Sequence, residues 1–167
     1  MILAKKLNQR PIQPSLIDRL IDREPENRKE AQDSRNQSLK ELKDSVRRDL
    51  EWLLNSRRCP VDVPASAKEL LRSVFSFGLP DITGVAMSSG EDRARLARMV
   101  EAAVTVFEPR LQNVTVSMKP VTPDSHLLRF QIEGLLRTEP APARVFFDTT
   151  LELSRGEYEV AGETRAR

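Results

Sequence analysis

The chain has 167 residues, of which 39% are hydrophobic and 31% are charged, and its formal net charge is +2. This length suits one domain with a modest core and an appended segment. The mild charge excludes the strongly basic surface of a dedicated nucleic-acid binder, and the 5% of aromatic residues leaves little material for a site built on stacked rings.

Side chains that ligate metals or act as nucleophiles are scarce. Cys59 is the only cysteine and His126 the only histidine, so no intrachain disulfide or Cys/His zinc site is possible. A Cys59–His126 nucleophilic pair is formally possible, but nothing around either residue suits it. We therefore expect no metal, no cofactor and no catalytic residue. The absence of an apolar run that could serve as a signal peptide or span a bilayer favours a cytoplasmic protein.

Residues 1–38 are predicted to form a short helix and a polar linker. Residues 15–22 carry one short apolar stripe, with Ser15 as a candidate helix cap. Residues 23–38 contain Ala31 as their only apolar residue, and such a segment buries too little surface to fold alone.

The main domain is expected over 39–161, followed by a polar tail at 162–167. It begins with an amphipathic helix that runs to about Asn55. The apolar residues of this helix recur at three- and four-residue steps and predict one buried face: Leu39, Leu42, Val46, Leu50, Leu53 and Leu54. On another face, Arg48 and Trp52 have the spacing of a stacked pair, although a solvated face explains them equally.

Two further helices follow. A short one is expected over 67–81, where Gly78 and Pro80 end it. The next is the clearest in the chain, because Ser88 and Glu91 have the spacing of a capping box before a long apolar stripe.

The triplet Glu108–Pro109–Arg110 should end this last helix. Proline restricts the residue before it, so the helix is expected to stop near Phe107 or Glu108, at the partially negative helix end where a carboxylate is disfavoured. Three interpretations remain open. The triplet is a helix stop in which Arg110 screens the acid, or it holds the general acid of a glycosidase, or it is an exposed acid–base pair that docks into a partner.

Beyond Pro109 the apolar period changes to two, which predicts an antiparallel sheet of three to four strands with one buried face. A short return strand is expected to begin at 154–157. The inward residues are expected to be Val114, Val116 and Met118, then Leu128, Phe130 and Ile132, then Val145, Phe147, Thr149, Leu151 and Leu153. Two amphipathic helices covering this face give an α+β fold.

The sheet offers a second candidate surface. A sheet edge exposes unpaired main-chain groups, to which another chain can add a strand. On the outward side of the third strand, Arg144, Phe146 and Asp148 place opposite charges around one aromatic ring. These three residues are candidate partner-binding residues, although a plain solvated face accounts for them as well.

Four motifs, in this order, resemble the TssE family of type VI secretion baseplate components, relatives of the contractile-phage baseplate wedge protein formerly labelled lysozyme-like. The resemblance covers roughly residues 15–160, with Ser56 and Phe77 at positions where the family commonly has Thr and Tyr. The motifs are SVRRDLEWLLNSRR (45–58), SFGLPD (76–81), FEPRL (107–111) and ARVFFDTTLEL (143–153).

The resemblance implies a non-enzymatic subunit at the cytoplasmic face of the inner membrane. Such a subunit would bind the wedge proteins TssF, TssG and TssK and start polymerisation of the TssB–TssC sheath, without nucleic acid or membrane insertion. By similarity, Arg48, Arg57 and the triplet Glu108–Pro109–Arg110 are expected to bind partners, the triplet at the helical core of the wedge. Two alternatives remain open: a peptidoglycan hydrolase that uses Glu108, and a cytosolic regulatory adaptor of the same fold.

Overall fold

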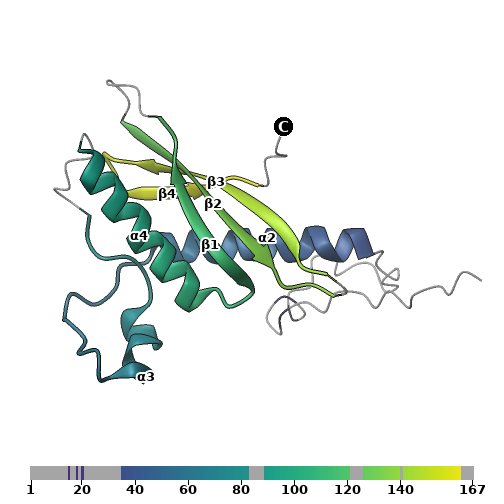
Figure 1. Ribbon diagram of the computed structural model, residues 1–167, viewed down its shortest axis with the longest axis horizontal. Helices are drawn as coiled ribbons and strands as arrows, with labels where there is room; N and C mark the ends of the chain where they lie inside the picture. The colour runs from purple at the N-terminus through teal and green to yellow at the C-terminus, as the bar shows by residue number, and fades with distance from the viewer. Residues whose placement is uncertain are drawn as a thin grey trace, which may run out of the picture. The chain divides into compact units, whose positions relative to one another are not determined.

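The chain divides into two compact units, Met1–Ser45 and Val46–Arg167. The computed structural model describes Ser15, Asp18, Leu20 and residues 35–82, 89–120, 126–139 and 141–162. The elements in chain order are α2 (Arg35–Asn55), α3 (Lys68–Leu71), the 3-10 turn η1 (Val74–Ser76), α4 (Gly90–Phe107), β1 (Leu111–Met118), β2 (Leu127–Leu136), β3 (Ala143–Glu152) and β4 (Glu157–Val160) (Figure 1).

Little of the first unit is described. The Asp18 N–H donates to Ser15 Oγ at 3.2 Å, which agrees with the cap expected at Ser15, and the Ser45 hydroxyl donates to Asp18 Oδ2 at 2.7 Å. The remainder of the helix expected at 15–22, like most of the polar linker, lies outside the described residues. Helix α2 is already present at Arg35, earlier than the expected start at Leu39; of the added residues, Arg35 and Gln37 are good helix formers even without an apolar stripe.

The second unit contains a four-stranded antiparallel sheet in the order β1-β2-β3-β4. The sheet buries one face, and the apolar stripes of α4 and of the second half of α2 complete the core. These side chains are at most 2% exposed: Val46, Leu50, Leu53, Leu54, Leu96, Val100, Val104, Leu128, Phe130, Ile132, Leu136, Val145, Phe147, Thr149, Leu151 and Val160. The predicted α+β fold is confirmed.

Strand β1 departs from simple alternation. Leu111 and Val116 are both buried, although an odd and an even position should face opposite sides. The register shifts between them, and Asn113 takes a left-handed φ of 51°, so β1 contains a bulge. Val114 and Met118, expected inward, are only half-buried.

The turn from β3 to β4 corrects one expectation. Leu153 was expected inward, but β3 ends at Glu152 and Leu153 is 37% exposed in the turn that follows. Gly156 has a φ of 67°, which reverses the chain. The return strand expected to begin at 154–157 begins at Glu157.

The helix expected over 67–81 is broken in two. The Ser73 hydroxyl donates to the Leu70 carbonyl at 2.9 Å and accepts from the Phe75 N–H at 3.3 Å. Serine competes with the helical hydrogen bonds in this way, so α3 stops and the separate turn η1 begins.

Helix α4 begins and ends close to the expected residues. Its cap is Ser89, whose Oγ accepts from the N–H groups of Glu91 and Asp92 at 3.2 and 3.4 Å. The cap is thus one position after the predicted Ser88, which itself lies outside the described residues. The stop predicted near Phe107 is confirmed. None of the helices in the described ranges has the length and hydropathy that a membrane span requires.

Gly78 should be essential to the loop that follows η1. Its φ is 101°, and a Cβ built there would lie 2.2 Å from the Ser56 carbonyl oxygen. We expect Gly78→Ala to lower the free energy of unfolding by at least about 2 kcal/mol, measured by urea denaturation. Gly90→Ala is the control, since a Cβ built there would lie 3.8 Å from the Arg93 guanidinium, an ordinary contact. Equal stabilities of the two variants would contradict this role.

Tyr158 should make the fold sensitive to alkali. Its hydroxyl is buried and has no hydrogen-bond partner among the described residues, and burial raises its pKa above the ordinary value of about 10. Stability is then unaffected below pH 10 and falls as pH rises further, because only the unfolded chain ionises readily. We expect the tyrosinate absorbance of this single tyrosine to appear together with unfolding. Tyr158→Phe should match wild type at neutral pH and resist alkali better.

Candidate functional site

The triplet forms a sharp corner between α4 and β1. Glu108 is the C-cap of α4, and its N–H donates to the Val104 carbonyl at 2.8 Å. Pro109 and Arg110 form the turn, and the Leu111 N–H then donates back to the Glu108 carbonyl at 3.1 Å, where β1 starts. Proline prevents the helix from continuing, so the backbone of the corner is rigid.

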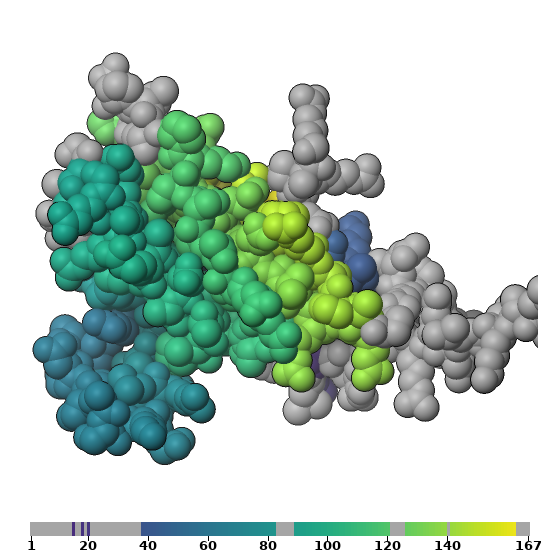
Figure 2. All heavy atoms as spheres, in the orientation of Figure 1, coloured from purple at the N-terminus to yellow at the C-terminus, as the bar shows by residue number. Residues whose placement is uncertain are grey.

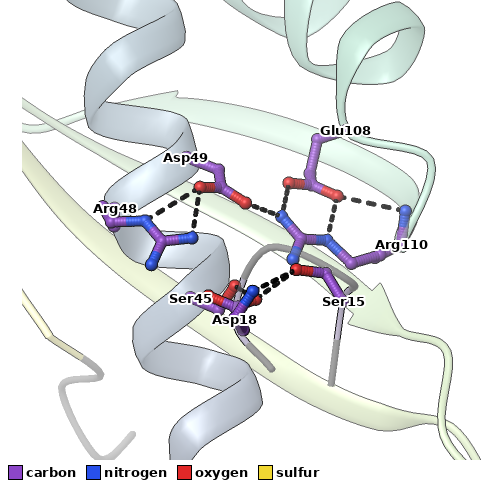
Figure 3. Close-up of polar contacts among 7 residues, drawn as sticks. All are labelled: Ser15, Asp18, Ser45, Arg48, Asp49, Glu108 and Arg110. Carbon is purple, nitrogen blue, oxygen red and sulfur yellow. Dashed lines mark hydrogen bonds and ion pairs between the residues drawn. The ribbon is translucent and has the colours of Figure 1, made fainter. Parts of the chain in front are cut away.

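The guanidinium of Arg110 binds two carboxylates (Figure 3). Arg110 donates through Nε to Glu108 Oε1 at 2.6 Å, and Nη2 contacts Glu108 Oε2 in a bidentate pair. Nη2 also donates to Asp49 Oδ2 on α2 at 2.5 Å. The Arg110 main-chain N–H adds a further bond to Glu108 Oε1 at 3.2 Å. This corner cluster (Asp49, Glu108 and Arg110) therefore joins α2 to the turn after α4.

The corner cluster explains how Glu108 tolerates a helix C-terminus. The side chain of Glu108 is 5% exposed, so the expectation of an exposed acid–base pair is wrong for the acid. Burial lowers the pKa of Arg110, but its hydrogen bonds and opposite charges at Glu108 and Asp49 outweigh this and raise the pKa above its ordinary value. The compensating cation belongs to the same chain.

Arg48 lies beside the corner cluster. Its Nε and Nη2 donate to Asp49 Oδ1 at 3.1 and 2.9 Å, so Asp49 bridges two arginines. The Arg48 guanidinium also lies over the Trp52 ring, 5.4 Å from its centroid. The spacing of this pair therefore does produce a stack. Trp52 is 61% exposed, so α2 presents a large aromatic surface beside the corner cluster, and the Arg48 guanidinium packs on its ring.

Arg57 stands apart from the corner cluster. Its side chain is 66% exposed and lies 3.7 Å from the Asp81 carboxylate in a solvent-accessible pair. Main-chain bonds fix the surrounding loop, since Leu79 N–H donates to the Ser56 carbonyl at 2.9 Å and Arg58 N–H donates to the Leu79 carbonyl at 3.0 Å.

The outward residues of β3 form a third group. Arg144 pairs with Glu133 and lies 5.3 Å from the centroid of the Phe146 ring. Asp148 accepts from the Lys119 ammonium at 2.6 Å. These residues face outward as expected, but β3 lies between β2 and β4 and is not an edge strand. Strands β1 and β4 are the edges.

The segment that contains α3 and η1 projects from the second unit (Figures 1 and 2). Its base is fixed by Phe77, which packs edge-on against Phe107 with ring centroids 5.3 Å apart. Three apolar side chains remain exposed on the projection: Leu70 at 39%, Leu71 at 38% and Val74 at 89%. The projection therefore adds an exposed apolar surface, and its base is anchored against the last residue of α4.

The structure thus brings some predicted residues together and keeps others apart. Glu108 and Arg110 meet Arg48 through Asp49, whereas Arg57 and the β3 group lie elsewhere. Asp49 was not among the predicted site residues, although it lies within the first motif of the family resemblance. Only its long-range contact with Arg110 reveals its role.

The acid of the corner is bound within the chain. Both Glu108 carboxylate oxygens contact Arg110, and the neighbouring acid, Asp49, binds the same guanidinium. A glycosidase places its two carboxyl groups around an open cleft that admits the sugar and water. Among the described residues, no group of three or more His, Cys, Asp or Glu could hold a metal ion.

The corner cluster should contribute measurably to stability. Glu108→Gln removes a buried charge that Arg110 binds, and we expect the free energy of unfolding to fall by about 2–3 kcal/mol. Asp49 is 30% exposed, so Asp49→Asn should cost about 1 kcal/mol. Urea denaturation measures both. The control is Glu51→Gln, since its i,i+4 pair with Arg47 is long, at 3.4 Å, and should change stability by less than about 0.5 kcal/mol. Equal effects at all three positions would contradict the cluster's role.

Comparisons with known proteins support the family suggested by the motifs. A comparison with curated proteins gave no match. The family model described as Baseplate wedge protein gp25 matches residues 40–141, which is more than half of the chain. The match includes the corner, all of β1 and β2, and most of α2. The chain belongs to the gp25 family of baseplate wedge proteins, structural proteins of phage-tail-like assemblies.

Proposed function

We propose that the protein is a TssE-type, non-enzymatic wedge subunit of a type VI secretion baseplate that initiates contractile sheath polymerisation. In this proposal it binds TssF, TssG and TssK at the cytoplasmic face of the inner membrane and receives the TssB–TssC sheath. The observation that carries the proposal is the rigid charged corner at Glu108–Pro109–Arg110, within a chain of the baseplate wedge family.

The corner supports binding because it is already ordered. Arg110 is held by two carboxylates, and Pro109 is exposed at the turn. A partner that meets such a surface does not have to immobilise a long flexible side chain, so less conformational entropy is lost on binding. In this proposal Glu108 positions Arg110 for the partner and is not itself the contact.

Neighbouring residues extend the proposed binding surface. Trp52 is exposed and Arg48 lies over its ring, and tryptophan and arginine are the residue types most enriched at the energetic centres of interfaces. Arg57 supplies an exposed positive charge in the loop after α2. A charge of this kind sets the orientation of docking, and reversing it would place like charges opposite each other, which lowers the affinity.

The sheet supports the second half of the proposal. A sheath subunit can be recruited by adding a strand to a sheet edge, where main-chain hydrogen bonds supply affinity and side chains set the register. The outward residues Arg144, Phe146 and Asp148 lie on the adjoining face, where they would select among incoming chains.

A charge reversal should separate binding from folding. Arg57→Glu should reduce co-purification of TssF, TssG and TssK at least tenfold, a change of about 1.4 kcal/mol. Arg155→Glu is a matched control, since the two arginines are 66% and 68% exposed and each lies 3.7 Å from an acid. We expect the control to co-purify like wild type, and both variants to keep the wild-type melting temperature.

The alternatives give different results in the same preparations. A regulatory adaptor would co-purify with neither wedge nor sheath subunits. A peptidoglycan hydrolase would clear a cell-wall suspension, and Glu108→Gln would abolish the clearance. Either result would overturn the proposal.

A further inference from the structure

The two edges of the sheet are not equivalent. In an antiparallel ladder, alternate residues direct their main-chain groups to opposite sides of the strand. Ala161 N–H donates to the Asp148 carbonyl at 2.8 Å, which directs the odd-numbered residues of β4 toward β3. Tyr158 and Val160 therefore direct their N–H and C=O groups away from the sheet.

Side chains of α2 occupy this outward side of β4. The Asn55 amide donates through Nδ2 to the Tyr158 carbonyl at 2.8 Å and accepts from the Tyr158 N–H through Oδ1 at 2.8 Å. One carboxamide thus makes both hydrogen bonds that a neighbouring strand would offer Tyr158. About two helical turns before Asn55 on α2, Arg47 Nη1 donates to the Val160 carbonyl at 3.3 Å. We call Asn55 and Arg47 the edge clamp.

Strand β1 has a different edge. Lys119 N–H donates to the Arg129 carbonyl at 2.8 Å, so the odd-numbered residues after the bulge face β2 and Val116 and Met118 face outward. The outward Val116 N–H donates to Glu101 Oε2 on α4 at 3.3 Å. Within the part of the chain that the structure describes, the Val116 carbonyl and the main-chain groups of Met118 have no such partner on this side.

We propose that the edge clamp closes β4 against other chains, so that a strand from another protein adds to β1. Unprotected edges pair readily with other chains, and β4 would otherwise be a second acceptor. Three hydrogen bonds protect β4, whereas one bond to a flexible Glu101 side chain protects β1. An incoming carbonyl can replace the Glu101 carboxylate at the Val116 N–H.

The shape of the β1 edge defines its partner. On one face the half-buried Val114 and Met118 offer apolar surface, and on the other the exposed Thr115 and Ser117 offer hydroxyl groups. The partner is therefore an extended segment whose alternate residues are apolar, with its apolar side toward the α4 layer. Its identity as a sheath subunit rests on the proposed function, but the closure of β4 does not.

The edge clamp can be tested with this protein alone. In sedimentation velocity on the full chain, Asn55→Ala should self-associate at concentrations at least tenfold below wild type. The control is Lys40→Ala, at an exposed position of α2 that belongs to neither the edge clamp nor its ion pair, and it should behave as wild type. If Asn55→Ala does not fold, Arg47→Ala, which loses one edge bond, should show at least a threefold shift. A folded clamp variant that sediments as wild type overturns the closure of β4.

The accepting edge is tested separately. Met118→Pro removes an N–H that faces outward and leaves the ladder with β2 intact, whereas Met118→Leu keeps that N–H. With purified sheath subunits, we expect Met118→Pro to slow sheath nucleation at least tenfold and Met118→Leu to match wild type. Nucleation at the wild-type rate by Met118→Pro overturns β1 as the acceptor. Absence of nucleation with wild type contradicts the proposed function, while the sedimentation result still decides the closure of β4.

Discussion

The guanidinium of Arg110 lies between carboxylates from two different elements, and the position of the corner depends on this contact. Glu108 comes from the end of α4 and Asp49 from α2. A buried carboxylate at a helix C-terminus is unfavourable by itself, because the last carbonyl groups carry partial negative charge. Arg110, two residues along the chain, offsets the cost of burying the Glu108 carboxylate and of placing it at the helix end. Asp49 binds the same guanidinium and so connects the corner to α2. The charged side chains of the family triplet thus bind each other and Asp49 within the chain, whether or not a partner is present.

Helix α2 connects the two candidate surfaces of the second unit. Its apolar stripe fills the core, while polar residues on either border of that stripe reach in different directions. Asp49 reaches the corner, and Arg47 and Asn55 reach the outer side of β4. A rotation of this helix would therefore disturb the corner and uncover the β4 edge together. One amphipathic helix serves packing, orientation of a charged site and protection of an edge.

The sequence predicted what depends on local periodicity. Three- and four-residue apolar steps identified α2 and α4, and alternation identified the buried faces of β2 and β3. It missed features that depend on a single local conformation, such as the bulge at Asn113 and the break at Ser73. It also missed contacts between distant residues: Asp49 and Arg110 are 61 positions apart, and Asn55 and Tyr158 are 103 apart. No periodic pattern records such pairs, because each requires the finished fold.

The bulge in β1 limits how tightly any strand can be held there. Regular pairing resumes at Thr115 and ends at Met118, so a guest strand finds about 14 Å of straight edge at ~3.4 Å per residue. Such a short ladder binds weakly and exchanges rapidly when it acts alone. Many copies held side by side would raise the effective concentration of acceptors, and avidity would then convert a transient contact into a lasting one. If β1 accepts a strand as proposed, a subunit built in this way would capture strands only where it has already been gathered into an array.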